Sequence, residues 1–123
     1  MKALLKNYHQ SPRKVRLVAD LIRGKSVPLA RAALLFLPKK SSPAITKLLD
    51  SAVANARATG VNPDNLFVKK ITVDKGTVLR RYRPFARGRA GSVRKTMSIV
   101  NLELGTGAAP TKAKKAKVVK ADK

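Results

Sequence analysis

Apolar residues recur at helical spacing in the first half of the chain, most clearly in its middle. Six of them follow the pattern i, i+3, i+4, i+7, i+8 and i+11, namely Ile45, Leu48, Leu49, Ala52, Val53 and Ala56. Ser41-Ser42-Pro43 stands ahead of this stripe as a helix start, and Gly60 follows it as a C-terminal cap. The pattern predicts a helix between these signals, with one face buried.

Two shorter helices are predicted ahead of this one. The first has an apolar stripe formed by Val15, Val18, Ala19, Leu21 and Ile22. Ser11 is suited to cap its free N–H groups, Pro12 suits the first helical position, and Gly24 ends it. The second covers residues 29–37, mostly Ala and Leu, and ends at Pro38.

Strand-forming residues dominate the second half. Residues 66–73 and 97–104 are rich in Val, Ile, Leu and Phe, which is typical of strands with one buried face. Residues 2–10 are interpreted as a short strand or extended arm, and residues 61–65 as a loop. Because the helices are grouped ahead of these strands, we expect an α+β fold, with a small three-helix body on a short antiparallel sheet.

Between the two strand segments lies a basic stretch that predicts a long protruding β-hairpin. It contains the turn-forming residues Pro84, Gly88 and Gly91, which place the tip near residues 87–91. Arms of about a dozen residues would reach about 40 Å. We therefore expect one domain over residues 1–104, with the body in 1–75 and 99–104 and the hairpin in 76–98. Residues 105–123, rich in Lys and Ala, are expected to form a flexible basic tail.

Charge indicates the partner of this hairpin. Seven cations and no acid lie between residues 80 and 95: Arg80, Arg81, Arg83, Arg87, Arg89, Arg94 and Lys95. The whole chain of 123 residues has 28 basic and 6 acidic residues, a net charge of +22, and the excess runs along its full length. Such a charge favours a protein surrounded by phosphate on several sides. Arg13, Lys14 and Arg16, near the start of the first helix, are further candidate contacts.

The side chains of the hairpin favour nucleic acid over a merely solvated ribbon. Charges can protect an exposed ribbon from aggregation, but mixed signs would serve that purpose equally well. Six of the seven cations are arginine, whose planar fork binds phosphate at two points. Tyr82 and Phe85 add flat surfaces for stacking on unpaired bases. The cations of the tail are all lysine. This composition suits sequence-independent neutralisation of phosphate charge, but a solvated tail without a specific partner explains it nearly as well.

Several function classes are disfavoured. The chain has no cysteine, and hence no disulfide or thiolate site. No apolar run of about 18 residues is present to span a bilayer, and the first residues do not resemble a secretory signal, so we expect a cytoplasmic protein. The amphipathic first and third helices could bind anionic lipid, but their capped, successive arrangement favours mutual burial.

Catalysis, a metal site and a cofactor are not expected. His9, the single histidine, has no carboxylate nearby in sequence and no second ligand at metal spacing. The acidic residues are scattered and are better explained as ion-pair partners. A nucleotide-binding loop requires glycines that come directly after a strand and begin a helix. Gly88 and Gly91 are not placed in this way. No small-molecule substrate is indicated.

Three ordered motifs give the chain a specific resemblance over residues 4–104. They are the segment from Ser11 to Lys25, SPRKVRLVADLIRGK; the segment from Leu49 to Ala56, LDSAVANA; and VDKG followed by RRYRP and ARGRA between Val73 and Ala90. Together they resemble the bacterial-type family of large-subunit ribosomal protein twenty-two.

The resemblance implies a body on the surface of the large subunit near the polypeptide exit, with a hairpin that threads inward. Arg80, Arg81, Arg83, Arg94 and Lys95 would then hold rRNA along the shaft. Arg87, Gly88, Arg89 and Ala90 would form a tip that lines the nascent-peptide tunnel. The implied partners are large-subunit rRNA, neighbouring ribosomal proteins and the nascent polypeptide.

Two hypotheses follow from the sequence. The first is a structural rRNA-binding component of the large ribosomal subunit that assists assembly and shapes the exit tunnel. The alternative is a DNA-bending architectural protein whose arginine-rich β-arm enters the minor groove.

Overall fold

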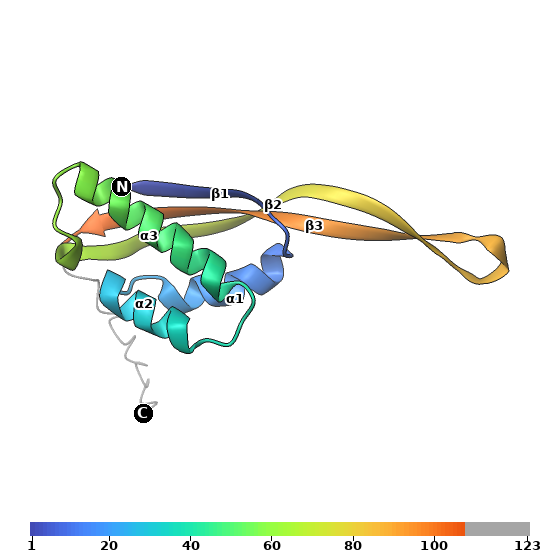
Figure 1. Cartoon of the computed structure of the whole chain (residues 1–123), viewed down its shortest axis with the longest axis horizontal. Helices are drawn as coiled ribbons and strands as arrows, with labels where there is room; N and C mark the ends of the chain where they lie inside the picture. Colours follow the sequence, from blue (N-terminus) through green and yellow to red (C-terminus); the bar gives the residue numbers. More distant parts are fainter. Residues whose placement is uncertain (108–123) are drawn as a thin grey trace, which may run out of the picture.

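A three-stranded antiparallel sheet in the order β1-β3-β2 forms the centre of the computed structural model, which describes residues 1–107. In chain order the elements are β1 (Lys2–Tyr8), α1 (Pro12–Ile22), α2 (Val27–Phe36), α3 (Ser42–Ala58), the short 3-10 helix η1 (Pro63–Asn65), β2 (Leu66–Pro84), the short 3-10 helix η2 (Ala86–Gly88) and β3 (Ala90–Thr106). Figure 1 shows the α-helices beside one half of the sheet and the hairpin projecting from it. The α+β fold with a long hairpin, expected from the sequence, is confirmed.

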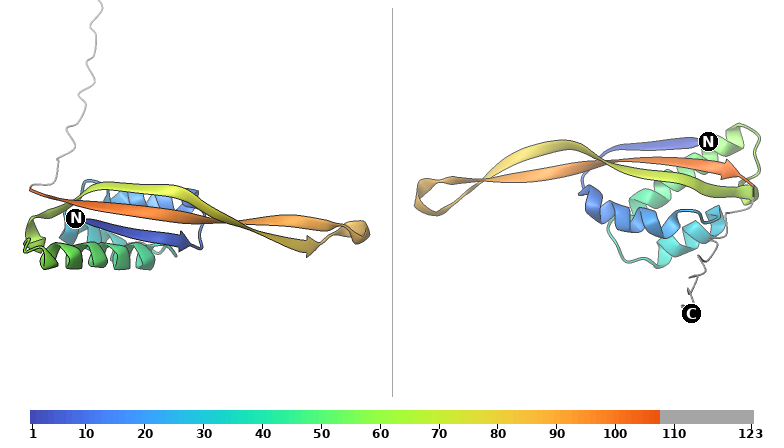
Figure 2. Two further views of the ribbon diagram at one scale, coloured as in Figure 1. Left: turned by 90° about the horizontal axis from the view of Figure 1, so that it is seen from above. Right: turned by 180° about the vertical axis from the view of Figure 1, so that it is seen from behind.

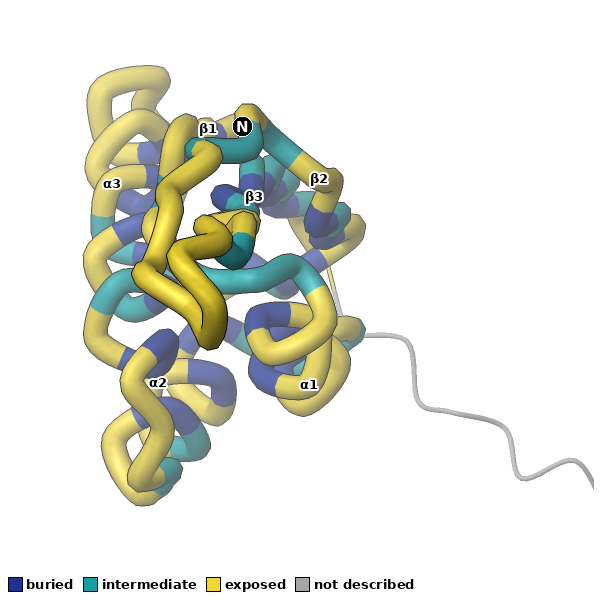
Figure 3. Tube along the Cα trace, turned by 90° about the vertical axis from the view of Figure 1, so that its right-hand side faces the viewer, coloured by how far each residue is buried: buried dark blue, intermediate teal, exposed yellow. Residues whose placement is uncertain are grey.

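The core lies between the helices and one face of the sheet. Viewed from the hairpin end, the helices lie beneath and to one side of the strands (Figure 3). The strands contribute Ile71, Val73, Val100 and Leu102, and the helices contribute Val15, Ile22, Ile45 and Leu49, all buried. Burial of these side chains is the main favourable term in folding, so the predicted apolar stripes hold the body together. Leu21, expected in the first stripe, is the exception, because it is 37% exposed.

The free edge of β2 is covered by α1 and the segment that follows it. The backbone N–H of Gly24 donates to the Val68 carbonyl at 3.1 Å, and the Val68 N–H donates to the Lys25 carbonyl at 2.9 Å. Further along, Arg23 Nη2 donates to the Ile71 carbonyl at 3.2 Å. These bonds satisfy backbone groups that would otherwise be open to pairing with another chain.

A β-bulge marks the point where the ribbon leaves the body. The pairing register shifts between Lys75, which faces Ser98, and Val78, which faces Thr96, so β2 contains one extra residue here. Such a bulge bends the strand and increases its twist. The twist is visible in Figure 1 and in both views of Figure 2, where the two strands wind around each other toward the tip.

Some boundaries differ from those expected. The side chain of Ser11 makes no capping hydrogen bond, and α2 begins at Val27. β3 continues to Thr106, two residues into the expected tail, because Gly105 pairs with Phe67. A Cβ at Gly105 would lie 2.9 Å from Phe67 Cζ, so the ring packs over this glycine and extends the strand. The lysines of the predicted tail lie outside the described residues.

Candidate nucleic-acid interface

The hairpin extends past the three-stranded sheet as a ribbon of two strands. Tyr8, the last residue of β1, pairs with Ser98, and from the pair of Val78 with Thr96 outward no third strand is present in the described chain. Residues 80–90 are all exposed. Figure 3 shows this part as a nearly continuous yellow tube in front of the body. The side chains of this part of the hairpin are therefore accessible to a binding partner.

The predicted cations of the shaft lie on both faces of the ribbon. Directly paired residues share a face, and the faces alternate along each strand. One face carries Arg80, Arg94 and Tyr82, because Arg80 pairs with Arg94 and Tyr82 with Ser92. The other face carries Arg81, Arg83 and Lys95, whose partners are Val93, Gly91 and Leu79. A ribbon with this distribution can contact phosphate groups on two opposite sides.

The two aromatic candidates are exposed. Tyr82 is 69% exposed on the shaft, and Phe85 is 72% exposed at the start of the turn. A Cβ on Gly91 would lie 3.8 Å from Phe85 Cδ2, so the ring lies beside this glycine. Both rings are therefore accessible on the surface of the hairpin.

The tip lies two residues nearer the N-terminus than expected. The turn runs from Phe85 to Arg89 and is closed by the Phe85 N–H, which donates to the Arg89 carbonyl at 2.7 Å. Gly91 is not part of the turn, because it is paired with Arg83 in the ribbon. Arg87, at φ 58°, and Gly88, at φ 68°, adopt left-handed conformations inside the turn. Of the expected tip residues, Arg87, Gly88 and Arg89 occupy the turn, and Ala90 is the first residue of β3.

The three basic candidates of α1 have different surroundings. Arg13 and Lys14 are exposed in the first turn. Arg16 Nε and Nη2 donate to the Val73 carbonyl at 3.1 and 2.9 Å, so this arginine ties α1 to β2. Arg16 therefore stabilises the packing of α1 on β2, a role that its charge alone did not indicate.

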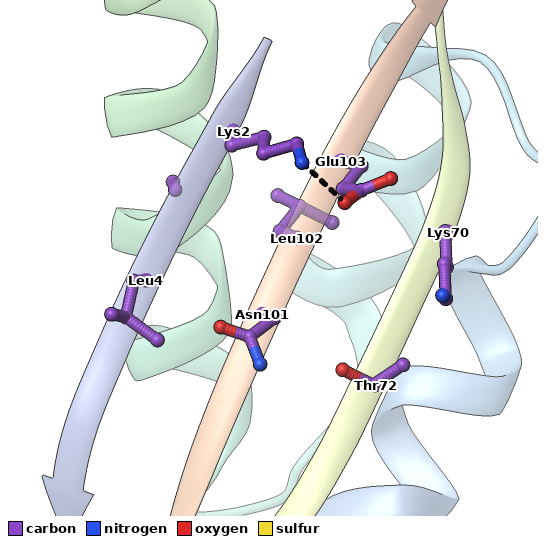
Figure 4. Close-up of a pocket in the computed structure, with 8 residues that line it drawn as sticks. Lys2, Leu4, Lys70, Thr72, Asn101, Leu102 and Glu103 are labelled. Atoms are coloured by element: carbon purple, nitrogen blue, oxygen red, sulfur yellow. Dashed lines mark ion pairs between the residues drawn. The ribbon is translucent and has the colours of Figure 1, made fainter.

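The outer face of the sheet is a second polar surface, and the sequence predictions did not include it. A shallow hollow of about 450 Å³ is lined by Lys2, Leu4, Lys70, Thr72, Asn101 and Glu103, among others. Figure 4 shows these side chains across the three strands, with Lys2 Nζ 3.1 Å from Glu103 Oε1. The hydrogen bond and the charge of Lys2 lower the pKa of Glu103. Alternation of apolar and polar residues in 100–104 was the signal that could have located this face.

Other kinds of site find little support in the described residues. In residues 1–107 no group of three His, Asp or Glu side chains could hold a metal ion. No helix of that part is long and apolar enough to cross a membrane. His9 is exposed and lies near lysines at the base of the hairpin.

Fold and surface together define a class: a small, basic α+β protein that carries arginine on a protruding two-stranded ribbon. The profile of the family described as ribosomal protein L22p/L17e matches residues 3–105. The chain belongs to this family, as the sequence motifs indicated.

Named relatives agree with this assignment. Large ribosomal subunit protein uL22 of Neorickettsia sennetsu is 51% identical over 106 residues, which cover 85% of this chain and 94% of the relative. The protein of the same name from Herpetosiphon aurantiacus is 47% identical, covering 86% and 95%. That of Trichlorobacter lovleyi is 54% identical, covering 76% and 84%. The chain is thus a structural ribosomal protein and not an enzyme, and the family decides against the DNA-bending alternative.

Proposed function

We propose that this chain is a structural component of the large ribosomal subunit, that it binds large-subunit rRNA, and that it works in the cytoplasm within that particle. The observation that carries the proposal is the exposed, acid-free run of seven cations on a hairpin outside the body. The family and the printed names of the relatives support it.

The shaft of the hairpin would bind RNA through backbone phosphates. Arg80, Arg81, Arg83, Arg94 and Lys95 are the contact residues, with Tyr82 stacking on an unpaired base. Guanidinium groups bind phosphate oxygens in pairs and release condensed counterions. Because cations lie on both faces, the ribbon can fill a gap between two RNA segments and hold them together. Bridging of this kind would assist assembly of the subunit.

The body would add contacts to RNA and to protein. Arg13, Lys14 and Arg16 at the start of α1 supply positive charge on its surface, and Arg16 would bind RNA while its guanidinium stays bonded to Val73. On α2, Leu29, Leu35 and Phe36 are exposed, and Phe36 reaches 88%. Apolar side chains at this exposure support a contact with neighbouring ribosomal proteins.

The tip would line the tunnel through which the nascent polypeptide leaves. The tip residues are Arg87, Gly88, Arg89 and Ala90, and the small side chains among them leave room for a passing chain. The structural support is the tight turn at the far end of the ribbon, the part of the described chain most distant from the body (Figure 1).

Co-sedimentation tests the proposal. The native protein should travel with large subunits in a sucrose gradient at moderate salt, and contacts with several phosphates should make binding of the purified protein to large-subunit rRNA steeply salt-dependent. Gel shifts on duplex DNA serve as the comparison and should show weaker binding. Recovery of the native protein only from the soluble pool would reject the proposal.

A further inference from the structure

A second hollow lies at the base of the hairpin, where the ribbon leaves the body. Its volume is about 490 Å³, within the range of small-ligand pockets. It is lined by His9, Gln10 and Ser11 of the β1–α1 connection, by side chains of α1 and of the α2–α3 connection, and by β2 and β3 at the start of the hairpin. We call it the junction hollow.

Three lysines from separate parts of the chain converge on the junction hollow. Lys14 comes from α1, Lys40 from the connection between α2 and α3, and Lys95 from β3. No acidic residue lines it. The ion pairs of the described chain lie elsewhere, at Lys2–Glu103, Arg23–Asp20 and Arg31–Asp50. The hollow is therefore a concentration of positive charge without an internal counterion.

The remaining lining suits the rest of a nucleotide. Leu79 and Met97 supply an apolar surface, and Gln10 Oε1 is buried without a hydrogen-bond partner in the described chain. The Ser11 side chain does not cap α1, and this helix has no acid in its first turn, so its positive end also faces the region without compensation. A ligand with a phosphate, a hydroxyl and a flat apolar part would satisfy all of these groups.

We propose that the junction hollow binds one nucleotide of the RNA, with its phosphate held by Lys14, Lys40 and Lys95 and its base or sugar against Leu79 and Met97. This inference rests on the proposed rRNA binding and names a specific subsite for it. Lys40 is the residue that no sequence motif indicated. Its place is fixed through the backbone, because the Tyr8 hydroxyl donates to the Lys40 carbonyl at 3.2 Å.

A phosphate at this position would join the body to the hairpin. Lys14 and Lys40 belong to the helical side of the molecule, whereas Lys95 is part of the ribbon, so one anion would bridge them. The bridge would limit the bending of the ribbon at the bulge between Lys75 and Val78. The direction in which the hairpin leaves the body would then be set by bound RNA.

A double-mutant cycle on affinity for large-subunit rRNA tests the subsite. The full-length protein is compared with Lys40→Gln, Lys95→Gln and the double variant, at one fixed salt concentration. Two lysines on the same phosphate act together, so the double variant should lose less affinity than the product of the single losses, by about threefold or more. Lys39→Gln is the matched control, because Lys39 is the exposed neighbour of Lys40 and does not line the junction hollow. Lys39→Gln combined with Lys95→Gln should be additive.

The outcomes separate the inference from the proposed function. Normal rRNA binding by the unsubstituted protein with additive effects in both cycles would overturn the subsite and leave the proposed function standing. Equal coupling in the Lys39 and Lys40 cycles would also overturn it, because the effect would then reflect general charge. Absence of rRNA binding by the unsubstituted protein would overturn both. The substituted lysines are exposed, and unchanged circular dichroism spectra would establish that all variants fold.

Discussion

Arg80 of β2 and Arg94 of β3 are directly paired across the hairpin, so two guanidinium groups share one face of the ribbon. Favourable cross-strand pairs contribute about 0.2–1 kcal/mol, and like charges at opposite positions destabilise an antiparallel pair, here taken to be of the same order. Arg94→Gln should therefore stabilise the hairpin of the free protein, slowing amide exchange of the neighbouring residues by about 1.5- to 5-fold at low salt. The same substitution should weaken rRNA binding and lower its salt dependence by about one phosphate contact.

Arg81→Gln is the matched control for this prediction. Arg81 pairs with Val93, so its removal takes away one positive charge without relieving a directly opposed one. Both variants should bind rRNA more weakly, but only Arg94→Gln should slow exchange appreciably. The same exchange rates in both would mean that the Arg80–Arg94 pair carries no specific repulsion.

Arg16 should matter for the stability of the isolated protein. Its two hydrogen bonds to the Val73 carbonyl tie α1 to the edge of β2. Arg16→Ala should lower the free energy of unfolding by about 1 kcal/mol, measured by urea denaturation. Arg13→Ala, on the same helix turn, should leave stability nearly unchanged and affect only RNA binding. If the two variants unfold at the same urea concentration, the bonds of Arg16 contribute nothing measurable.

The Lys2–Glu103 pair predicts a pH dependence. Lys2 lowers the pKa of Glu103 in the folded protein. A carboxylate with a lowered folded pKa stabilises the fold above its unfolded pKa, and this contribution disappears as the pH falls through the folded pKa. Lys2→Met should be less stable than the wild type near neutral pH, with the difference vanishing in acid. The effect should be modest, because the Lys2 side chain is 79% exposed and that of Glu103 is 32% exposed, so solvent screens the pair.

An NMR titration of the Glu103 carboxyl group checks the cause directly. The pKa of Glu103 should rise toward its ordinary value in Lys2→Met. Lys6→Met, on the same strand but outside the hollow that Glu103 lines, is the control and should leave the titration unchanged. A Glu103 titration curve that is the same in Lys2→Met and wild type would show that the ion pair is absent in solution.

Gly105 should resist substitution because of Phe67. A Cβ at position 105 would lie 2.9 Å from Phe67 Cζ and 3.0 Å from Cε1, so the ring would have to move. Gly105→Ala should destabilise the fold by about 1 kcal/mol, as overpacking does elsewhere. In a Phe67→Ala background the same change should cost little. If Gly105→Ala destabilises the Phe67→Ala variant as much as the wild type, the backbone and not the Phe67 ring would be what disfavours a side chain at position 105.

The tip prediction concerns the tunnel. Ala90 is exposed at the start of β3, where a bulky side chain is compatible with the backbone, whereas Gly88 at φ 68° would be strained by any side chain. Ala90→Trp should still enter large subunits but alter the passage of nascent chains or the action of drugs that bind in the tunnel. Ribosome profiling and drug-sensitivity curves measure this, with Ala90→Ser as the control. Curves for Ala90→Trp that match the control would count against a tip that lines the tunnel.

Local patterns predicted the elements, and tertiary contacts decided the details. The stripe from Ile45 to Ala56 located α3 because burial against the sheet depends on spacing alone. The predicted position of the turn was wrong by two residues. Gly91 is a residue type typical of turns, but here it pairs with Arg83 inside the ribbon and lies beside the Phe85 ring. The family motifs indicate the ribosomal assignment from the residues alone.

The contacts that remained hidden in the sequence are those between distant segments. Nothing near Arg16 indicates that the Val73 carbonyl will lie beside it, 57 residues further along the chain. Likewise Lys40 lines the same hollow as Lys14 and Lys95, and its connection is bonded to the end of β1 through the Tyr8 hydroxyl. Such arrangements depend on how the helices dock, which periodicity does not specify.

The two strands of the hairpin are the same two that the helices bury in the body, with register set by buried partners such as Val73 and Val100. Adding or deleting a single residue in one arm would turn the side chains beyond it, such as Arg80 and Tyr82, to the opposite face of the ribbon. Changes of length that preserve the arrangement must come as two residues in each arm at once. The reach of this protein into its surroundings could thus evolve in steps of about 7 Å.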